Sequence, residues 1–147
     1  KIEGDNCTPK GLYKLGFAFG TLDNIFSYPY YKINENHYWV SDTESKYYNE
    51  WVEINENNKI YPYSYMNNTD KITWNNAEHL IDYPIQYKLA FVIEYNMFPK
   101  VPNRGSAIFF HVNKNNVTAG CVATSLHNLL FIINWLQKDQ AQIIISD

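Results

Sequence analysis

Two residue types are scarce in this chain of 147 residues, which contains two cysteines and one arginine. Two cysteines allow a single disulfide, between Cys7 and Cys121, and a chain of this length can build a core without that bond. Because the bond would consume the one thiol that the motifs below mark as reactive, we expect both cysteines to stay reduced.

Basic charge and long apolar runs are also lacking. Lysine and arginine number 12 against 15 aspartates and glutamates, which gives a net charge of −3. Without a long basic run, nucleic-acid binding has little electrostatic support. No apolar run reaches the length of a transmembrane helix, and no signal-peptide pattern opens the chain.

The first residues have the composition of a loop, and the chain shows neither an internal repeat nor a linker. We therefore expect residues 1–147 to form one domain, and we expect it to be a monomer. We also expect its leader to lie upstream, with additional first strands upstream as an open alternative.

Aromatic and apolar residues are plentiful, at 17% and 46% of the chain. This balance is typical of a globular domain, and the many tyrosines favour short β-strands. Residues 25–33, interrupted by a proline, are expected to be extended but irregular, and residues 55–70 to form a loop. Alternation or short apolar runs predict strands in residues 12–19, 37–40, 50–54, 87–95, 106–112 and 141–145.

Helical features occur in two segments. Residues 126–137 place leucine and isoleucine on one face, and Ser125 is suited to cap the first turn. Residues 73–80 are predicted to form a short helix capped by Thr73. The expected fold class is therefore mostly β (α+β), with one principal helix.

A histidine and a cysteine lie on adjoining elements near the C-terminus. His111 ends an apolar run, and nine residues separate it from Cys121, which directly precedes the principal helix. A thiol beside an imidazole is the minimum equipment for nucleophilic acyl transfer. The alternative is that Cys121 is a small buried apolar residue and His111 a hydrogen-bonded strand end.

The surroundings of Cys121 favour the catalytic interpretation. A free thiol is only slightly ionised at neutral pH, so His111 as a base and the N-terminus of the following helix are two possible activators. Gly120 permits a tight turn in which its amide and that of Cys121 would face a developing oxyanion. The remaining histidines show no metal-ligand spacing with each other or with a cysteine pair, so we expect no zinc site.

These residues resemble the signature of YkuD-type L,D-transpeptidases, a histidine followed by Ser/Thr-x-Gly-Cys, here Thr118-Ala119-Gly120-Cys121. The family's upstream motif, Gly-Asp-x-x-Thr-Pro-x-Gly, is matched by residues 4–11. Shorter matches resemble the ErfK/YbiS-like branch and keep a consistent order along the chain. They lie at residues 39–42, 48–49, 95–96 and 105–109.

The resemblance implies a YkuD-like catalytic domain, a β-sandwich or barrel-like structure that acts on peptidoglycan stem peptides outside the bacterial cytoplasm. Cys121 would attack the carbonyl that precedes a terminal D-alanine and release that residue. The thioester would pass to an amine of an acceptor stem, giving a 3–3 cross-link, or to water. His111 would activate the thiol and protonate the leaving amine, and the reaction would need neither a cofactor nor a metal. The Thr118 hydroxyl is expected to orient His111 or to close the loop, with a plain turn contact as the open alternative.

Two positions depart from the family pattern. Many members carry histidine where this chain has Ala119, which would serve His111 only through its backbone carbonyl. Many also carry arginine where Ala123 stands. We therefore expect the only arginine, Arg104, to bind a substrate carboxylate, since a guanidinium makes bidentate pairs, with a solvated loop charge as the open alternative. We also expect Ala119 to contact the substrate.

Two other functions stay open from the sequence. One is an L,D-carboxypeptidase or endopeptidase that hydrolyses the same thioester, and the other is a non-catalytic wall-binding module. A papain-like protease is set aside because its cysteine precedes its histidine, the reverse of the order here.

Overall fold

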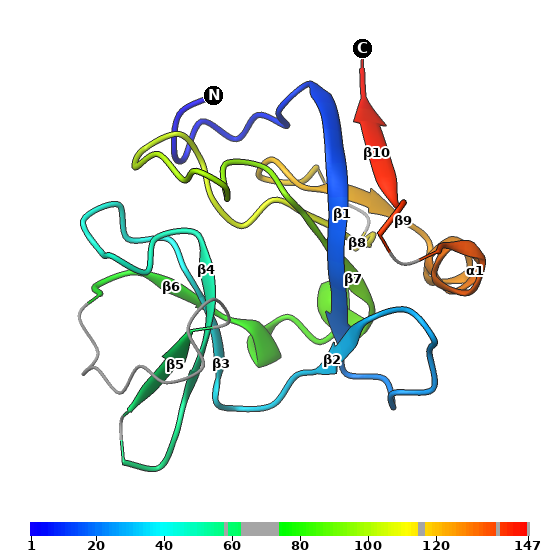
Figure 1. Ribbon diagram of the computed structural model, residues 1–147, viewed down its shortest axis with the longest axis horizontal. Coiled ribbons are helices and arrows are strands. Elements are labelled where there is room, and N and C mark those ends of the chain that lie inside the picture. Colours follow the sequence, from blue (N-terminus) through cyan, green and yellow to red (C-terminus); the bar gives the residue numbers. More distant parts are fainter. Residues whose placement is uncertain (58, 63–73, 115–116, 138, 147) are drawn as a thin grey trace.

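The computed structural model describes residues 1–57, 59–62, 74–114, 117–137 and 139–146, which form two β-sheets and an α-helix (Figure 1). The larger sheet has the strand order β10-β1-β7-β8-β9, and β2 pairs with the end of β1. Its strands are β1 (Gly11–Gly20), β2 (Tyr30–Lys32), β7 (Ala90–Ile93), β8 (Phe109–Val112), β9 (Val122–Thr124) and β10 (Gln142–Ile145). The pairs β10–β1, β1–β7 and β7–β8 run antiparallel, whereas β1–β2 and β8–β9 run parallel.

Apolar side chains cover both faces of the larger sheet. Along β7, Phe91 and Ile93 belong to the core beneath the helix, whereas Ala90 and Val92 belong to the core shared with the smaller sheet. Successive side chains of a strand point to opposite faces, so a strand that is covered on both faces needs an unbroken apolar run. This explains why β7 and β8 lack the apolar–polar alternation of a half-exposed strand.

The smaller sheet has the order β5-β4-β3-β6 and lies on one side of β1, opposite the helix (Figure 1). Its strands are β3 (His37–Val40), β4 (Glu50–Ile54), β5 (Ile60–Pro62) and β6 (Ala77–His79). Trp39 packs edge-on against Phe109 with 4.9 Å between ring centroids, and Trp51 packs against Phe19 at 5.5 Å. Aromatic side chains therefore join the two sheets.

Asn49 ties the smaller sheet to the connection between β7 and β8. Its Oδ1 accepts hydrogen bonds from Trp39 Nε1 at 3.0 Å and from the Ala107 amide at 3.1 Å. Its Nδ2 donates to the carbonyls of Tyr95 and Asn96. The residue is buried and has φ of 56°, a left-handed conformation that asparagine tolerates well.

The principal helix, α1 (Leu126–Trp135), begins where the sequence predicts and ends two residues earlier, because Leu136 is extended. The Ser125 side chain accepts a hydrogen bond from the Asn128 amide at 3.2 Å, so the predicted N-cap is confirmed. Leu129 and Ile133 are buried against the larger sheet. No helix in the described residues is long and apolar enough to span a membrane.

The predicted helix over residues 73–80 is wrong in the part that is described. Residues 77–79 form β6, which pairs antiparallel with β3 and places Glu78 opposite Trp39. Two short 3₁₀ turns follow, η1 (Leu80–Asp82) and η2 (Gln86–Lys88). Pairing with a strand distant in sequence overrides the weak local helix signal, whose proposed cap, Thr73, lies outside the described residues.

Three other predicted segments differ from the structure by more than one residue. The loop predicted for residues 55–70 contains β5, while residues 58 and 63–70 lie outside the described part. The strand predicted for residues 87–95 begins only at Ala90, after η2. The strand predicted for residues 106–112 begins at Phe109, because Ala107 has φ of 52° and cannot continue a regular strand.

Candidate active site

The parallel pairing of β8 and β9 brings Cys121 and His111 to one face of the larger sheet. His111 lies opposite Ala123, so the same register places Cys121 beside Phe109. The Phe109 amide indeed lies 3.4 Å from the Cys121 sulfur. Phe109 and His111 are two residues apart on one strand and therefore share a face. Both catalytic candidates consequently point toward the smaller sheet.

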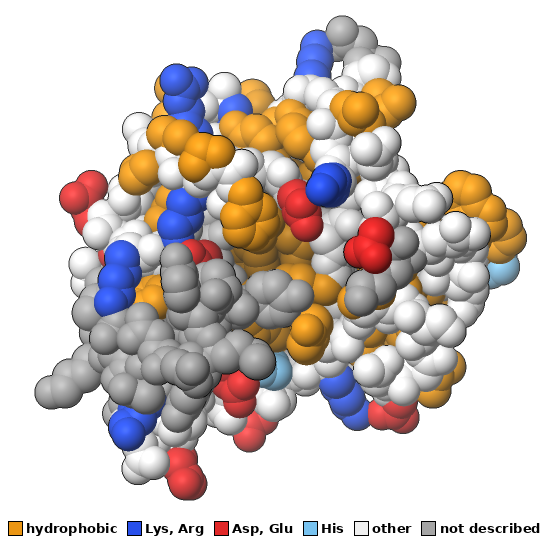
Figure 2. All heavy atoms as spheres, viewed as in Figure 1, with side chains coloured by type: hydrophobic (Ala, Val, Ile, Leu, Met, Phe, Trp, Pro, Cys, Tyr) orange, Lys and Arg blue, Asp and Glu red, His pale blue; other side chains and the backbone are white. Residues whose placement is uncertain are grey.

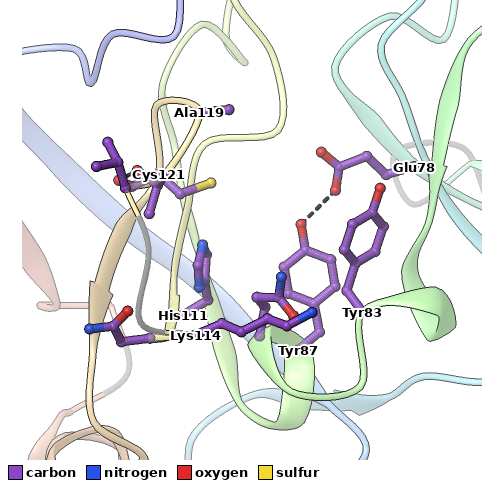
Figure 3. A pocket seen from close by; sticks show the side chains of 11 residues that line it. Glu78, Tyr83, Tyr87, His111, Lys114, Ala119 and Cys121 are labelled. Atoms are coloured by element: carbon purple, nitrogen blue, oxygen red, sulfur yellow. Dashed lines mark hydrogen bonds between the residues drawn. The ribbon is translucent and has the colours of Figure 1, made fainter.

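Between the two sheets, a cleft of about 390 Å³ adjoins both side chains. Hydrophobic side chains gather in the middle of the molecule where the sheets meet, with charged side chains mostly around them (Figure 2). In the close view, Ala119 and Cys121 lie across the cleft from Glu78 and Tyr83 (Figure 3). The lining residues are Glu78, Tyr83, Gln86, Tyr87, His111, Asn113, Lys114, Val117, Thr118, Ala119 and Cys121.

The Cys121 thiol is held in its neutral form. Its Sγ donates to the Ala107 carbonyl at 3.3 Å and accepts from the Phe109 amide at 3.4 Å. Burial raises the pKa of Cys121 to about 12, and the charge of Glu78 adds to the rise. Because β9 lies between Cys121 and α1, the thiol does not stand at the N-terminus of the helix, and stabilisation of a thiolate by the helix stays a prediction.

His111 is oriented by its own chain neighbour. Its Nδ1 lies 2.9 Å from the Val112 carbonyl oxygen, an acceptor that requires the hydrogen to sit on Nδ1. Nε2 is then the basic nitrogen. Burial lowers the pKa of His111, so the imidazole is neutral at pH 7. Among the described residues, no hydrogen bond joins it to Cys121, and the resting pair is a thiol and a neutral imidazole.

The turn that carries Cys121 is closed by Thr118, whose hydroxyl donates to the Cys121 carbonyl at 2.6 Å. This bond lies within the turn, and among the described residues no hydrogen bond joins Thr118 to His111. Gly120 has φ of +128°, and a Cβ there would lie 3.0 Å from the Cys7 carbonyl oxygen. Both the backbone angle and the close approach favour glycine at this position.

The upstream glycine-rich motif, residues 4–11, packs beside this turn through the Cys7 carbonyl. Asp5 holds its shape, accepting hydrogen bonds from the amides of Ile2 at 2.8 Å and Cys7 at 2.9 Å. Bonding to Lys1 above all, together with these amides, keeps the pKa of Asp5 well below its usual range. The contact between the Cys7 carbonyl and the turn at Gly120 makes the two sequence motifs neighbours in space. Cys7 and Cys121 both lie in the described part and are free thiols.

A family model for the YkuD L,D-transpeptidase catalytic domain matches residues 1–145. The chain belongs to this family. No curated protein and no solved structure matches the chain. The resemblance drawn from the sequence motifs is thereby confirmed for the family, and so is the mostly-β fold with one principal helix. The ErfK/YbiS-like branch stays a prediction.

The structure does not bring Arg104, the residue expected to bind a substrate carboxylate, to the cleft. Arg104 is exposed on the connection between β7 and β8, where its carbonyl accepts a hydrogen bond from the Tyr95 hydroxyl at 2.6 Å. It is not among the residues that line the cleft, whereas Ala119 and Lys114 are. Among the described residues, Lys114 is therefore the cation at the cleft.

Glu78 and Tyr87 are cleft residues that the sequence analysis missed. The Tyr87 hydroxyl donates to Glu78 Oε2 at 2.5 Å, and the Tyr87 ring lies edge-on to His111 with 5.9 Å between centroids. Burial raises the pKa of both side chains. The predicted helix concealed Glu78, because only its place on β6 turns it toward the larger sheet. The described residues contain no cluster of three or more side chains able to hold a metal.

Proposed function

We propose that this chain is a peptidoglycan L,D-transpeptidase that uses Cys121 as nucleophile and His111 as base. The carrying observation is the shared cleft: both side chains line it, and the Nδ1–Val112 bond leaves Nε2 as the basic nitrogen. A neutral imidazole beside a neutral thiol is the starting state of general-base catalysis. Membership of the family supports peptidoglycan stem peptides as the substrate class.

Acylation would begin when the donor stem enters the cleft. The His111 Nε2 takes the Cys121 proton as sulfur attacks the carbonyl carbon that precedes the terminal D-alanine. The carbonyl electrons move to oxygen, where the amides of Gly120 and Cys121, at the turn fixed by Thr118, are suited to stabilise the charge. On collapse, the C–N bond breaks and the imidazolium returns its proton to the departing D-alanine amine.

The thioester would then be consumed by a second nucleophile. Attack by an amine of an acceptor stem breaks the C–S bond, forms the 3–3 amide and returns a proton to sulfur. Attack by water gives the tripeptide stem instead, the carboxypeptidase or endopeptidase outcome. Both outcomes use the same acyl-enzyme, so the competing nucleophile decides between them.

Substrate binding in this proposal involves Lys114 and Ala119. Lys114 lines the cleft and offers a cation to a stem carboxylate, the role expected of Arg104 from the sequence. Exchanging Lys114 for alanine would raise KM for a tetrapeptide donor, whereas exchanging Arg104 for alanine would not. Because peptidoglycan lies outside the cytoplasm, we place the activity there, with donor and acceptor stems as its partners.

Intact-mass spectrometry with a disaccharide-tetrapeptide tests the proposal. We expect a covalent adduct on the wild-type chain, no adduct on Cys121→Ala, and release of D-alanine. Analysis of the remaining products separates transfer from hydrolysis. A folded, reduced protein that forms no adduct and retains affinity for peptidoglycan would instead support the wall-binding module.

A further inference from the structure

Glu78 is an acidic side chain in the wall of the cleft opposite the nucleophile (Figure 3). It reaches this position because β6 pairs with β3 and sets Glu78 opposite Trp39, whose ring packs toward the larger sheet. Tyr87, from η2, donates to its Oε2 at 2.5 Å, the dashed line in Figure 3. Two separate elements thus hold this carboxyl group at the cleft.

The charge of Glu78 does not assist the first half of the proposed reaction. It contributes to raising the pKa of Cys121, since a nearby anion disfavours a thiolate. Burial raises the pKa of Glu78 itself, and the charge of Glu3 adds to that rise. Burial disfavours the Glu78 anion, and that anion in turn disfavours a Cys121 thiolate. A cationic ligand bound beside the carboxylate would offset both effects.

A primary ammonium group meets the requirement of this carboxylate. An ionised carboxylate has about four acceptor positions, and Tyr87 is the hydrogen-bond donor that the described residues supply to it. An ammonium brings a positive charge and three N–H donors. On the proposed function, such a group enters the cleft in the second half-reaction, as the amine of the acceptor stem.

Resting on that proposed function, we propose that Glu78 binds the ammonium group of the acceptor and so favours transfer of the acyl group to an amine over its transfer to water. Tyr87 is a positioning residue for this carboxylate. Lys114, on the same cleft, complements Glu78 by offering a cation to a carboxylate of the stem. The acceptor chemistry that fits this site is a primary amine that is protonated near pH 7.

The transfer step balances with Glu78 as the first proton acceptor. The ammonium gives one proton to the Glu78 carboxylate, and the neutral amine attacks the thioester carbonyl carbon. A C–N bond forms, the C–S bond breaks, and the electron pair goes to sulfur. The second nitrogen proton reaches sulfur through His111, and Glu78 releases its proton to solvent. The net products are an amide, the free thiol and one proton.

Glu78→Gln tests the inference, with Glu53→Gln on β4 of the same sheet as the matched control, since Glu53 is exposed and outside the cleft. Disaccharide-tetrapeptide serves as both donor and acceptor, and acylation, cross-linked dimer and hydrolysed tripeptide are followed separately. We expect Glu78→Gln to lower the ratio of dimer to tripeptide about tenfold or more, since it loses a charge-assisted bond to the ammonium. Its acylation rate should rise, because the Cys121 pKa falls. Glu53→Gln should keep both values.

The outcomes separate this inference from the proposed function. Absence of acylation in the wild-type chain would remove the proposed function. Normal acylation with an unchanged dimer-to-tripeptide ratio in Glu78→Gln would overturn the role of Glu78 alone. Loss of acylation in folded Glu78→Gln would also overturn it, because Glu78 would then act in the first half-reaction.

A measurement on the wild-type chain keeps the inference testable if Glu78→Gln does not fold. The acyl-enzyme is partitioned between water and an added nucleophile, either Nα-acetyl-lysine amide, which is cationic near pH 7, or hydroxylamine, which is mostly neutral there. We expect the lysine derivative to saturate and hydroxylamine to react without saturation. A linear dependence for both nucleophiles would overturn binding of the ammonium.

Discussion

The neutral thiol of Cys121 leads to a prediction that can be measured on the resting protein. Its pKa of about 12 lies roughly three units above that of an ordinary thiol, so the thiolate fraction near pH 7 is reduced about a thousandfold. Because the thiolate is the reactive form, iodoacetamide should alkylate native Cys121 more slowly, by a similar factor, than it alkylates a solvent-exposed thiol of ordinary pKa.

Peptide mass mapping after timed alkylation measures this rate, and the exposed Cys7 provides an internal reference in the same molecule. Burial also hinders the reagent, so the pH dependence is the sharper criterion. The Cys121 rate should rise about tenfold per pH unit from pH 7 to pH 10, as expected well below a pKa. A rate that levels off near pH 9, or equals that of Cys7 at pH 7, would refute the reasoning.

Three further predictions concern Asn49, Gly120 and His111. Asn49→Ala removes four hydrogen bonds and leaves the buried Trp39 Nε1 and Ala107 amide without these partners. Urea unfolding should therefore show a free energy of unfolding lower by about 3–5 kcal/mol. The control Asn134→Ala, at an exposed helix position, should change it little. Gly120→Ala should lower the free energy of unfolding by about 1–3 kcal/mol and slow acylation. Gly4 also has a positive φ but has open space around it, so Gly4→Ala should strain the backbone without affecting acylation. The neutral form of His111 is the base, and burial lowers its pKa. The acid limb of the kcat/KM profile should therefore lie below pH 6.5 and should be absent from the residual activity of His111→Gln. An acid limb above pH 6.5 would contradict the buried imidazole.

The sequence predicted the elements whose signals are local. Ser125 caps α1 as expected, because the side chain and amide that form the cap are only three residues apart. The apolar runs that became β7 and β8 identified strands buried on both faces. His111, the Thr118-Ala119-Gly120-Cys121 motif and the upstream motif at residues 4–11 together indicated the family that the match over residues 1–145 confirms.

Contacts between segments distant in sequence decided the rest. The β3–β6 pairing turned a predicted helix into a strand and brought Glu78 to the cleft. The electrostatic state of Cys121 likewise depends on burial and on Glu78, which no spacing near the cysteine encodes. Arg104 was proposed for its chemistry, but the fold lines the cleft with Lys114. Local propensity and motif spacing thus determine elements and chemical identity, whereas strand pairing and burial determine which charges meet the nucleophile and whether it is ionised.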